Sequence, residues 1–222
     1  KMKKSYISFK DITKLIPSVK FPEYFYNIGI IKFDGEYTGF INDFVAYGSL
    51  DTKVGKISTD LNFKLMPGKG IPEYSGKLTL YDFNLGKFIN IEKYFGLVSM
   101  TGSIIGKGIT LEDLQADIKA GISSLSFNNY TYKNISYDGF ITKKILKGRL
   151  DINDENFMLN FDGSIDLTLP KPIYKYSAII KNADLYKLHF AKDTFNIDCE
   201  MDINLMANNY DDIEGTVNII NP

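Results

Sequence analysis

Residues 157–169 read Phe-Met-Leu-Asn-Phe-Asp-Gly-Ser-Ile-Asp-Leu-Thr-Leu, and this stretch decides the predicted fold. Its odd positions carry Phe, Leu, Ile or Gly, while the even positions between them are mostly polar. Because successive side chains of a strand point to opposite faces, the alternation predicts one strand, Phe157–Leu169, with an apolar and a polar face. At about 3.3 Å per residue this strand would reach roughly 40 Å, whereas typical strands have about 5–6 residues.

Two further stretches alternate in the same way, namely Ile57–Leu65 and Phe195–Leu205, and shorter alternating runs occur between them. In residues 76–85 the alternation slips by one position at Tyr81-Asp82, which predicts a bulge or a bend. Turn residues separate the runs, and no amphipathic helix exceeds one or two turns. The pattern therefore predicts antiparallel meanders rather than βαβ units.

The domain organisation predicted from the chain is simple. Residues 1–34 form an N-terminal segment in which Asp11 would cap a short helical turn that Pro17 ends. Residues 35–222 form a repetitive sheet. The chain also aligns with itself at a shift of about 100 residues, which predicts an internal repeat of 74–122 in 174–222. The matched residues include Tyr74 with Tyr174, Leu85 with Leu185, Lys87 with Lys187, and Leu111-Glu112-Asp113-Leu114 with Tyr210-Asp211-Asp212-Ile213.

Composition narrows the class of protein. The 222 residues suffice for one large all-β domain or two small ones. With 44% hydrophobic and 24% charged residues, the chain is neither disordered nor membrane-spanning in composition. Aromatic residues comprise 15 Tyr and 16 Phe with no Trp, an enrichment that favours strands.

Charge and cysteine content exclude further classes. Lys and Arg (26) nearly balance Asp and Glu (27), so no basic excess exists to bind nucleic acid. The single cysteine, Cys199, excludes an intrachain disulfide and lies on the apolar side of its strand, where a small core residue is expected. No run of about 20 apolar residues occurs. We expect the chain to be a piece of a longer protein, with any export signal or anchor outside it.

Catalytic and metal-binding patterns are weak. A catalytic triad or a zinc site needs clustered ligands, and the only histidine, His189, is predicted to be structural. Asp151, Asn153 and Glu155 have the spacing of a calcium loop, but Asn156 stands where that loop needs glycine. A hairpin turn explains these residues better. We therefore predict no enzyme activity, no cofactor and no metal.

Several short motifs carry a resemblance to a known family. They are the segment from Phe33-Asp34-Gly35 to Leu65, the triplets Tyr137-Asp138-Gly139 and Phe161-Asp162-Gly163, and Gly106-Lys107-Gly108-Ile109-Thr110-Leu111-Glu112-Asp113-Leu114. In this order they resemble the TamB/AsmA-like proteins of Gram-negative envelopes, most closely over residues 28–170.

The resemblance implies a fold and a function. The family consists of long periplasmic proteins that are anchored in the inner membrane and fold as a repeating, U-shaped sheet, the β-taco, with an apolar concave face. Its members act in outer-membrane assembly and in phospholipid transport between the two membranes, and TamB-type members work with an Omp85-type outer-membrane barrel. This chain would be a segment of such a periplasmic bridge, reaching the barrel only through its parent protein. The family has no catalytic residues.

On this interpretation the apolar stripes line an open groove that takes phospholipid acyl chains, each buried CH₂ contributing about 0.8 kcal/mol. The alternative is a closed β-sandwich, acting as a non-catalytic binding or scaffold module; an enzyme such as a carbohydrate hydrolase lacks any sequence support. Unpaired edge strands would favour self-association of the fragment. The predicted groove residues are Ile57, Leu61, Phe63, Leu65, Val98, Met100, Ile104, Phe157, Leu159, Phe161, Ile165, Leu167, Phe195, Ile197, Met201, Ile203 and Leu205.

Overall fold

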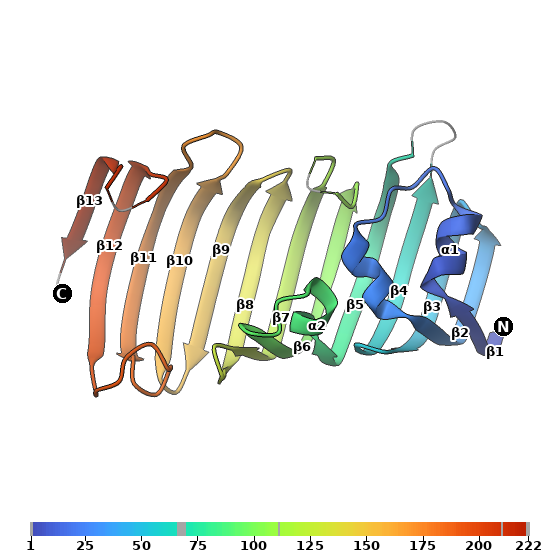
Figure 1. Ribbon diagram of the computed structural model, residues 1–222, viewed down its shortest axis with the longest axis horizontal. Helices are drawn as coiled ribbons and strands as arrows, with labels where there is room; N and C mark the ends of the chain where they lie inside the picture. Colours follow the sequence, from blue (N-terminus) through green and yellow to red (C-terminus); the bar gives the residue numbers. More distant parts are fainter. Residues whose placement is uncertain (1, 66–69, 111, 210, 221–222) are drawn as a thin grey trace.

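The computed structural model describes residues 2–65, 70–110, 112–209 and 211–220, and within them thirteen strands form one open sheet. Each strand pairs antiparallel with its neighbours in sequence, so the order is simply β1 to β13 (Figure 1). The strands are β1 Met2–Ser8, β2 Ile30–Phe40, β3 Asp43–Thr52, β4 Gly55–Leu65, β5 Pro72–Asn84, β6 Phe95–Lys107, β7 Gln115–Phe127, β8 Tyr130–Thr142, β9 Ile145–Asp154, β10 Phe157–Asp166, β11 Ile173–Asp184, β12 Asn196–Met206 and β13 Glu214–Ile220.

Three short helices complete the described part of the chain: α1 Phe9–Leu15, the 3-10 helix η1 Glu23–Ile28, and α2 Leu85–Ile89. The predicted all-β, long antiparallel sheet is thus confirmed. The alternative of a closed sandwich is wrong, because the strands form one sheet and no second sheet faces it in the described residues.

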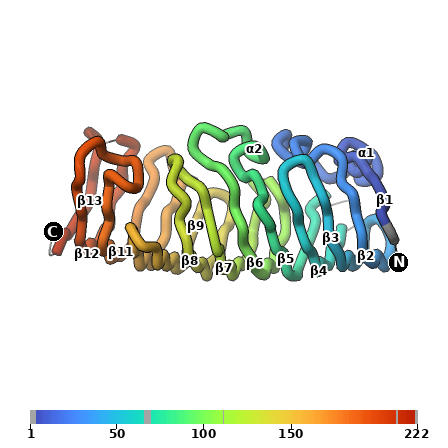
Figure 2. The backbone as a smooth tube through the Cα atoms, turned by 90° about the horizontal axis from the view of Figure 1, so that it is seen from below, coloured from blue at the N-terminus to red at the C-terminus, as the bar shows by residue number. Residues whose placement is uncertain are grey.

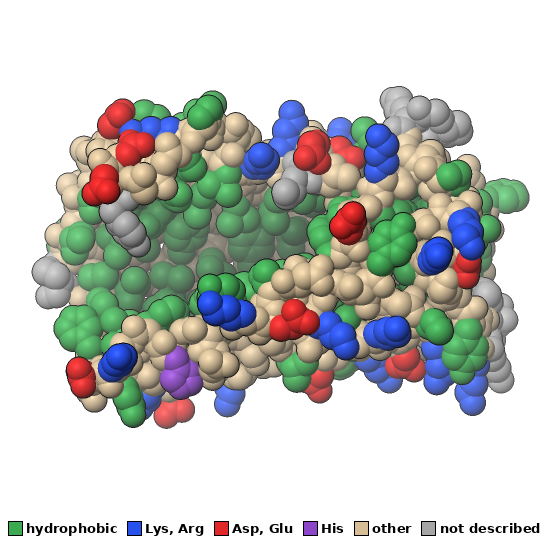
Figure 3. Space-filling view, in the orientation of Figure 1, with side chains coloured by type: hydrophobic (Ala, Val, Ile, Leu, Met, Phe, Trp, Pro, Cys, Tyr) green, Lys and Arg blue, Asp and Glu red, His purple; other side chains and the backbone are tan. Residues whose placement is uncertain are grey.

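The sheet forms a trough rather than a flat plate. Seen along the strands, it bends toward the side that carries α1 and α2 (Figure 2). That side is hollowed, and hydrophobic side chains gather on the floor of the hollow (Figure 3). The concave face is therefore the apolar face of the strands.

The strand at Phe157 is shorter than the sequence pattern predicts. β10 ends at Asp166 rather than at Leu169. The Asp166 carboxylate accepts the backbone N–H of Thr168 at 2.8 Å and also its hydroxyl, which turns the chain before Pro170. A local side-chain-to-backbone hydrogen bond of this kind competes with the sheet ladder, and alternation alone does not reveal it.

The predicted bulge in β5 is confirmed. The pairing of β5 with β6 shifts between Leu80 and Phe83, and Asp82 adopts a φ of 44°. The extra residue frees the Asp82 N–H from the ladder, and the Ser99 hydroxyl accepts it at 3.0 Å. Because one residue is inserted, both Leu80 and Phe83 face the trough.

The N-terminal segment differs from its prediction in two ways. Residues 2–8 form a strand that pairs with β2, and the predicted boundary at residue 35 falls inside β2. The helical turn is present as α1, but its cap is Ser8, whose hydroxyl accepts the Asp11 N–H at 3.1 Å. Ser8 ends β1 in an extended conformation, the geometry of an N-cap residue, whereas Asp11 lies in the first turn.

Connection lengths divide the strands after β1 into two successive groups of six, β2–β7 and β8–β13. The five connections of the first group span 2, 2, 6, 10 and 7 residues, and those of the second span 2, 2, 6, 11 and 7. The predicted matches Leu85/Leu185 and Lys87/Lys187 lie in the long fourth connection of each group. Among the predicted matches, Leu111 and Tyr210 lie outside the described residues, as do 221 and 222.

A buried hydroxyl in the first group offers a test of the packing. The Thr59 side chain is 7% exposed, and its Oγ1 has no hydrogen-bond partner among the described residues. An unpaired buried polar group costs about 1–3 kcal/mol. We expect Thr59→Val to raise the free energy of unfolding by about 1 kcal/mol, measured by urea denaturation.

The control is Thr38→Val at an exposed position of β2, where a change within about 0.5 kcal/mol is expected. A destabilised Thr59→Val variant would mean that the hydroxyl has a partner in solution.

Candidate binding groove

The floor of the trough consists of four rows of side chains that run across the strands, perpendicular to them. Register places the residues of one row directly opposite one another on successive strands, so a row follows the long axis of the trough. The rows are numbered from the rim that carries α2, here called the α2 rim. None of their residues carries a charge, and most are aliphatic, aromatic or glycine.

The first row is Phe33, Leu50, Ile57, Leu80, Met100, Ile122, Ile135, Ile152, Leu159, Ile180 and Cys199. The second row is Gly35, Gly48, Thr59, Leu78, Gly102, Ala120, Tyr137, Leu150, Phe161, Ala178, Met201 and Ile219.

The third row is Tyr37, Ala46, Leu61, Gly76, Ile104, Ile118, Gly139, Gly148, Gly163, Tyr176, Ile203 and Val217. The fourth row is Gly39, Phe44, Phe63, Tyr74, Gly106, Ala116, Ile141, Leu146, Ile165, Tyr174, Leu205 and Gly215.

The opposite, convex face is polar and charged. There Lys119 Nζ lies 3.0 Å from an Asp138 carboxylate oxygen, and Arg149 Nε lies 3.0 Å from Asp151. These pairs are largely exposed, so each contributes little to stability. The convex face therefore carries charged side chains, whereas the floor on the concave face is uncharged.

Most residues predicted to line the groove lie in the four rows, and the exceptions have physical causes. Leu65 is buried against Ile16 and Val19, and Val98 is buried in the cluster that includes Leu85 and Phe88 of α2. Both are therefore covered rather than open. Leu167 and Phe195 lie just outside β10 and β12 and are exposed at the rims. The others that lie in a row are Ile57, Leu61, Phe63, Met100, Ile104, Leu159, Phe161, Ile165, Met201, Ile203 and Leu205; Phe157 and Ile197 lie nearer the α2 rim.

The predicted lining residues come from β4, β6, β10, β12 and their flanks, so sequence reasoning missed the floor that the other strands supply, including Tyr137, Leu150 and Tyr176. Phe161 lies opposite Leu150, and its ring centroid is 4.9 Å from that of Tyr176. Alternation was visible in parts of these strands, but the partner of each residue depends on turn positions that alternation does not define.

Two segments of the α2 rim fold over the floor in corresponding places. In α2, the Asn84 side chain accepts the Lys87 N–H at 2.8 Å; in the later segment, Asp184 accepts the Lys187 N–H at 3.1 Å. The segment 185–190, here called the strap, presents Leu188, which is only 2% exposed and packs against Tyr132 and Ile135. A segment that begins with such a side-chain cap therefore occurs in each six-strand group, in its long fourth connection.

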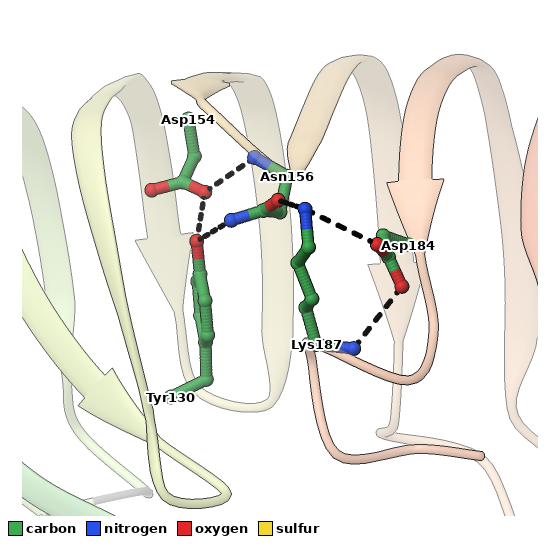
Figure 4. A network of polar contacts seen from close by, with 5 residues as sticks. All are labelled: Tyr130, Asp154, Asn156, Asp184 and Lys187. Atoms are coloured by element: carbon green, nitrogen blue, oxygen red, sulfur yellow. Dashed lines mark hydrogen bonds and ion pairs between the residues drawn. The ribbon is translucent and has the colours of Figure 1, made fainter. Parts of the chain in front are cut away.

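A buried carboxylate anchors the rim beneath the strap (Figure 4). Asp154 is 3% exposed, and it accepts the Tyr130 hydroxyl and the backbone N–H groups of Lys133 and Asn156, both at 3.0 Å. The Asn156 amide also donates to the Tyr130 oxygen at 3.0 Å. With three donors the buried charge is well compensated, so Asp154 joins β8 to the β9–β10 turn.

Lys187 extends this network to the strap. Its ammonium donates to the Asn156 side-chain oxygen at 2.9 Å and lies 3.4 Å from the Asp184 carboxylate (Figure 4). On the other side, Asn128 donates its side-chain amide to the His189 carbonyl at 2.9 Å. The His189 Nδ1 lies 3.2 Å from the Asn128 carbonyl. These contacts hold the strap over the floor.

The polar residues singled out in the sequence, His189 and the series Asp151, Asn153 and Glu155, form no metal-binding cluster in the described part of the chain. Across the described ranges, no group of three or more His, Cys, Asp and Glu side chains is placed to hold a metal ion. Asp151, Asn153 and Glu155 belong to the β9–β10 hairpin, in which Asp154 pairs with Phe157, so the predicted hairpin turn is confirmed. A helix able to cross a membrane is absent from the described part of the chain.

Comparison with known proteins adds no relative: the chain matches no family model, no curated protein and no solved structure. Its function must therefore be argued from the trough itself.

Tyr132, which packs against Leu188 of the strap, leads to a prediction for stability at alkaline pH. Burial raises the pKa of Tyr132 to about 12 from its ordinary value of 10, and the nearby Tyr130 and Asp154 add to the rise. The unfolded chain therefore releases this proton first, so the stability that Tyr132 contributes is present below pH 10 and is lost between pH 10 and about 12. We expect the urea midpoint of Tyr132→Phe to fall less steeply than that of the wild type over this range.

Tyr47→Phe is the matched control, because Tyr47 is 63% exposed on the polar face. Its slope should follow the wild type. Equal slopes for wild type and Tyr132→Phe would contradict the assigned environment of Tyr132.

Proposed function

We propose that this chain binds phospholipid by its acyl chains and carries them along the trough, as a segment of a TamB/AsmA-like bridge. The observation that supports this most is the uncharged floor of four rows, whose side chains remain partly exposed over much of the open trough (Figure 3). A continuous apolar surface of this extent is unusual in a protein that binds nothing there.

The geometry suits a long alkyl chain. Each methylene group moved from water onto such a floor gains about 0.8 kcal/mol, without any directional contact. The rows run along the trough axis with similar chemistry at successive strands. An acyl chain can therefore shift along the axis without breaking specific bonds, which favours transport over fixed binding.

The resemblance of the sequence to TamB/AsmA-like proteins extends the proposal to the cell envelope. The parent protein would reach across the periplasm from an inner-membrane anchor, support outer-membrane biogenesis, and engage an Omp85-type barrel. In that setting the present chain would act without catalysis, since lipid transfer along a groove breaks no covalent bond.

A pair of neighbouring substitutions tests lipid binding. Ile203 lies on the floor, and Asn204 is the next residue on the polar face of β12. Ile203→Asp and Asn204→Asp add the same charge to opposite faces. We expect Ile203→Asp to weaken binding of phosphatidylglycerol about tenfold, equivalent to losing contact with about two methylenes, while Asn204→Asp leaves it unchanged.

Binding is measured by fluorescence titration with labelled phosphatidylglycerol, and folding by circular dichroism. Because Ile203 is only partly buried, both variants should fold. Failure of the folded wild type to bind lipid, or equal binding by both variants, would refute the proposed function.

A further inference from the structure

The two halves of the trough differ in how their floors are built. In the second row, the strands β2–β7 contribute mostly small residues, and β8–β13 contribute mostly large ones. The first set is Gly35, Gly48, Thr59, Leu78, Gly102 and Ala120; the second is Tyr137, Leu150, Phe161, Ala178, Met201 and Ile219.

Residues 9–29 lie over the half with the small floor residues. α1 and η1 cross the concave face of the strands near the N-terminus (Figures 1 and 2), and the hollow of Figure 3 is filled there. Ile16 and Val19 of this segment are buried against Leu65 at the end of β4, and Phe63 of the fourth row packs against the same cluster. Residues 9–29 therefore cover part of the floor in the N-terminal half.

An aromatic cluster packs residues 9–29 together and against α2. The ring centroids of Phe9 and Phe21 are 5.1 Å apart, and those of Phe25 and Phe88 are 5.5 Å apart, so the cluster joins the segment to α2. The Asn27 side chain also donates to the Phe88 carbonyl at 2.9 Å. Residues 9–29 and α2 therefore form one continuous cover over part of the N-terminal half of the floor.

Among the residues that the structure describes, the C-terminal half has no such cover beyond the strap at its α2 rim. Phe161 and Met201 remain partly exposed on the floor, and Val217 and Ile219 of β13 are exposed at its end. From β8 to β13 there are five strand spacings, which makes about 24 Å at about 4.8 Å each. An acyl chain spans about half of a hydrocarbon core of about 30 Å, so it fits along this section.

We propose that phospholipid acyl chains lie over β8–β13, while residues 9–29 keep them from the floor of the N-terminal strands. This inference rests on the proposed lipid-carrying function and assigns its binding section. The strap narrows the section from the α2 rim and leaves the second to fourth rows for the ligand.

Photolabelling locates the ligand without any substitution. The folded protein is mixed with phosphatidylglycerol vesicles that contain a phospholipid with a diazirine in its acyl chain, irradiated, and digested for mass spectrometry. We expect labels on floor residues of β8–β13, with less than a tenth of that yield on β2–β5. Labels on both halves would overturn the assigned binding section while leaving lipid carriage intact; no label on the folded protein would refute both.

Two adjacent residues of β13 test whether this strand belongs to the binding section. Ile219 lies opposite Met201 on the floor, whereas Ile220 lies opposite Glu200 on the polar face, and the two are similarly exposed. Ile219→Lys should weaken binding of phosphatidylglycerol about fourfold, the change that corresponds to losing one buried methylene. Ile220→Lys should leave the affinity unchanged. Equal affinities for the two variants would overturn the assignment of β13 to the binding section.

Discussion

The whole structure depends on the register of strand pairing, because the register decides which side chains of each strand face the trough. Each strand pairs with the next in sequence, and a side chain faces the trough only while that pairing keeps its register. A slip of one residue would move the whole apolar set of a strand to the convex face. At the two bulges, side chains of the next strand accept the N–H groups that the ladder leaves unpaired. Ser99 accepts the N–H of Asp82, and Asp198 accepts the N–H of Asn182.

A single sheet of this kind cannot bury its apolar face by itself, because no second sheet packs against it in the described residues. The two halves of the sheet differ in which segment covers their apolar face. Over the first half, residues 9–29 fold back and pack against Phe63 and Leu65, and in the described part of the second half only the strap around Leu188 covers the floor. The apolar surface that remains lies on the concave face, and the charged side chains lie on the convex face.

The strap illustrates how a few polar groups position an apolar site. Asp154 is buried, yet its three donors come from β8 and the β9–β10 turn, so its charge is compensated locally. Lys187 then connects that anchored rim to the strap. Loss of one partner from such a buried group leaves an unpaired charge, so the network favours one arrangement of the rim.

Alternation in the sequence by itself determined the strand class, the polar and apolar faces, the bulge at Asp82 and the floor residues of β4, β6, β10 and β12, because side-chain parity is a local property of an extended chain. It overestimated the strand at Phe157, since the turn made by Asp166 competes locally with the ladder. Only the tertiary structure decided that the sheet stays open, that Leu65 and Val98 are covered, and that the floor of β8, β9 and β11 joins the rows. These features depend on contacts between residues far apart in the chain, such as Ile16 with Leu65 or Leu188 with Tyr132, and no local pattern encodes which residues meet.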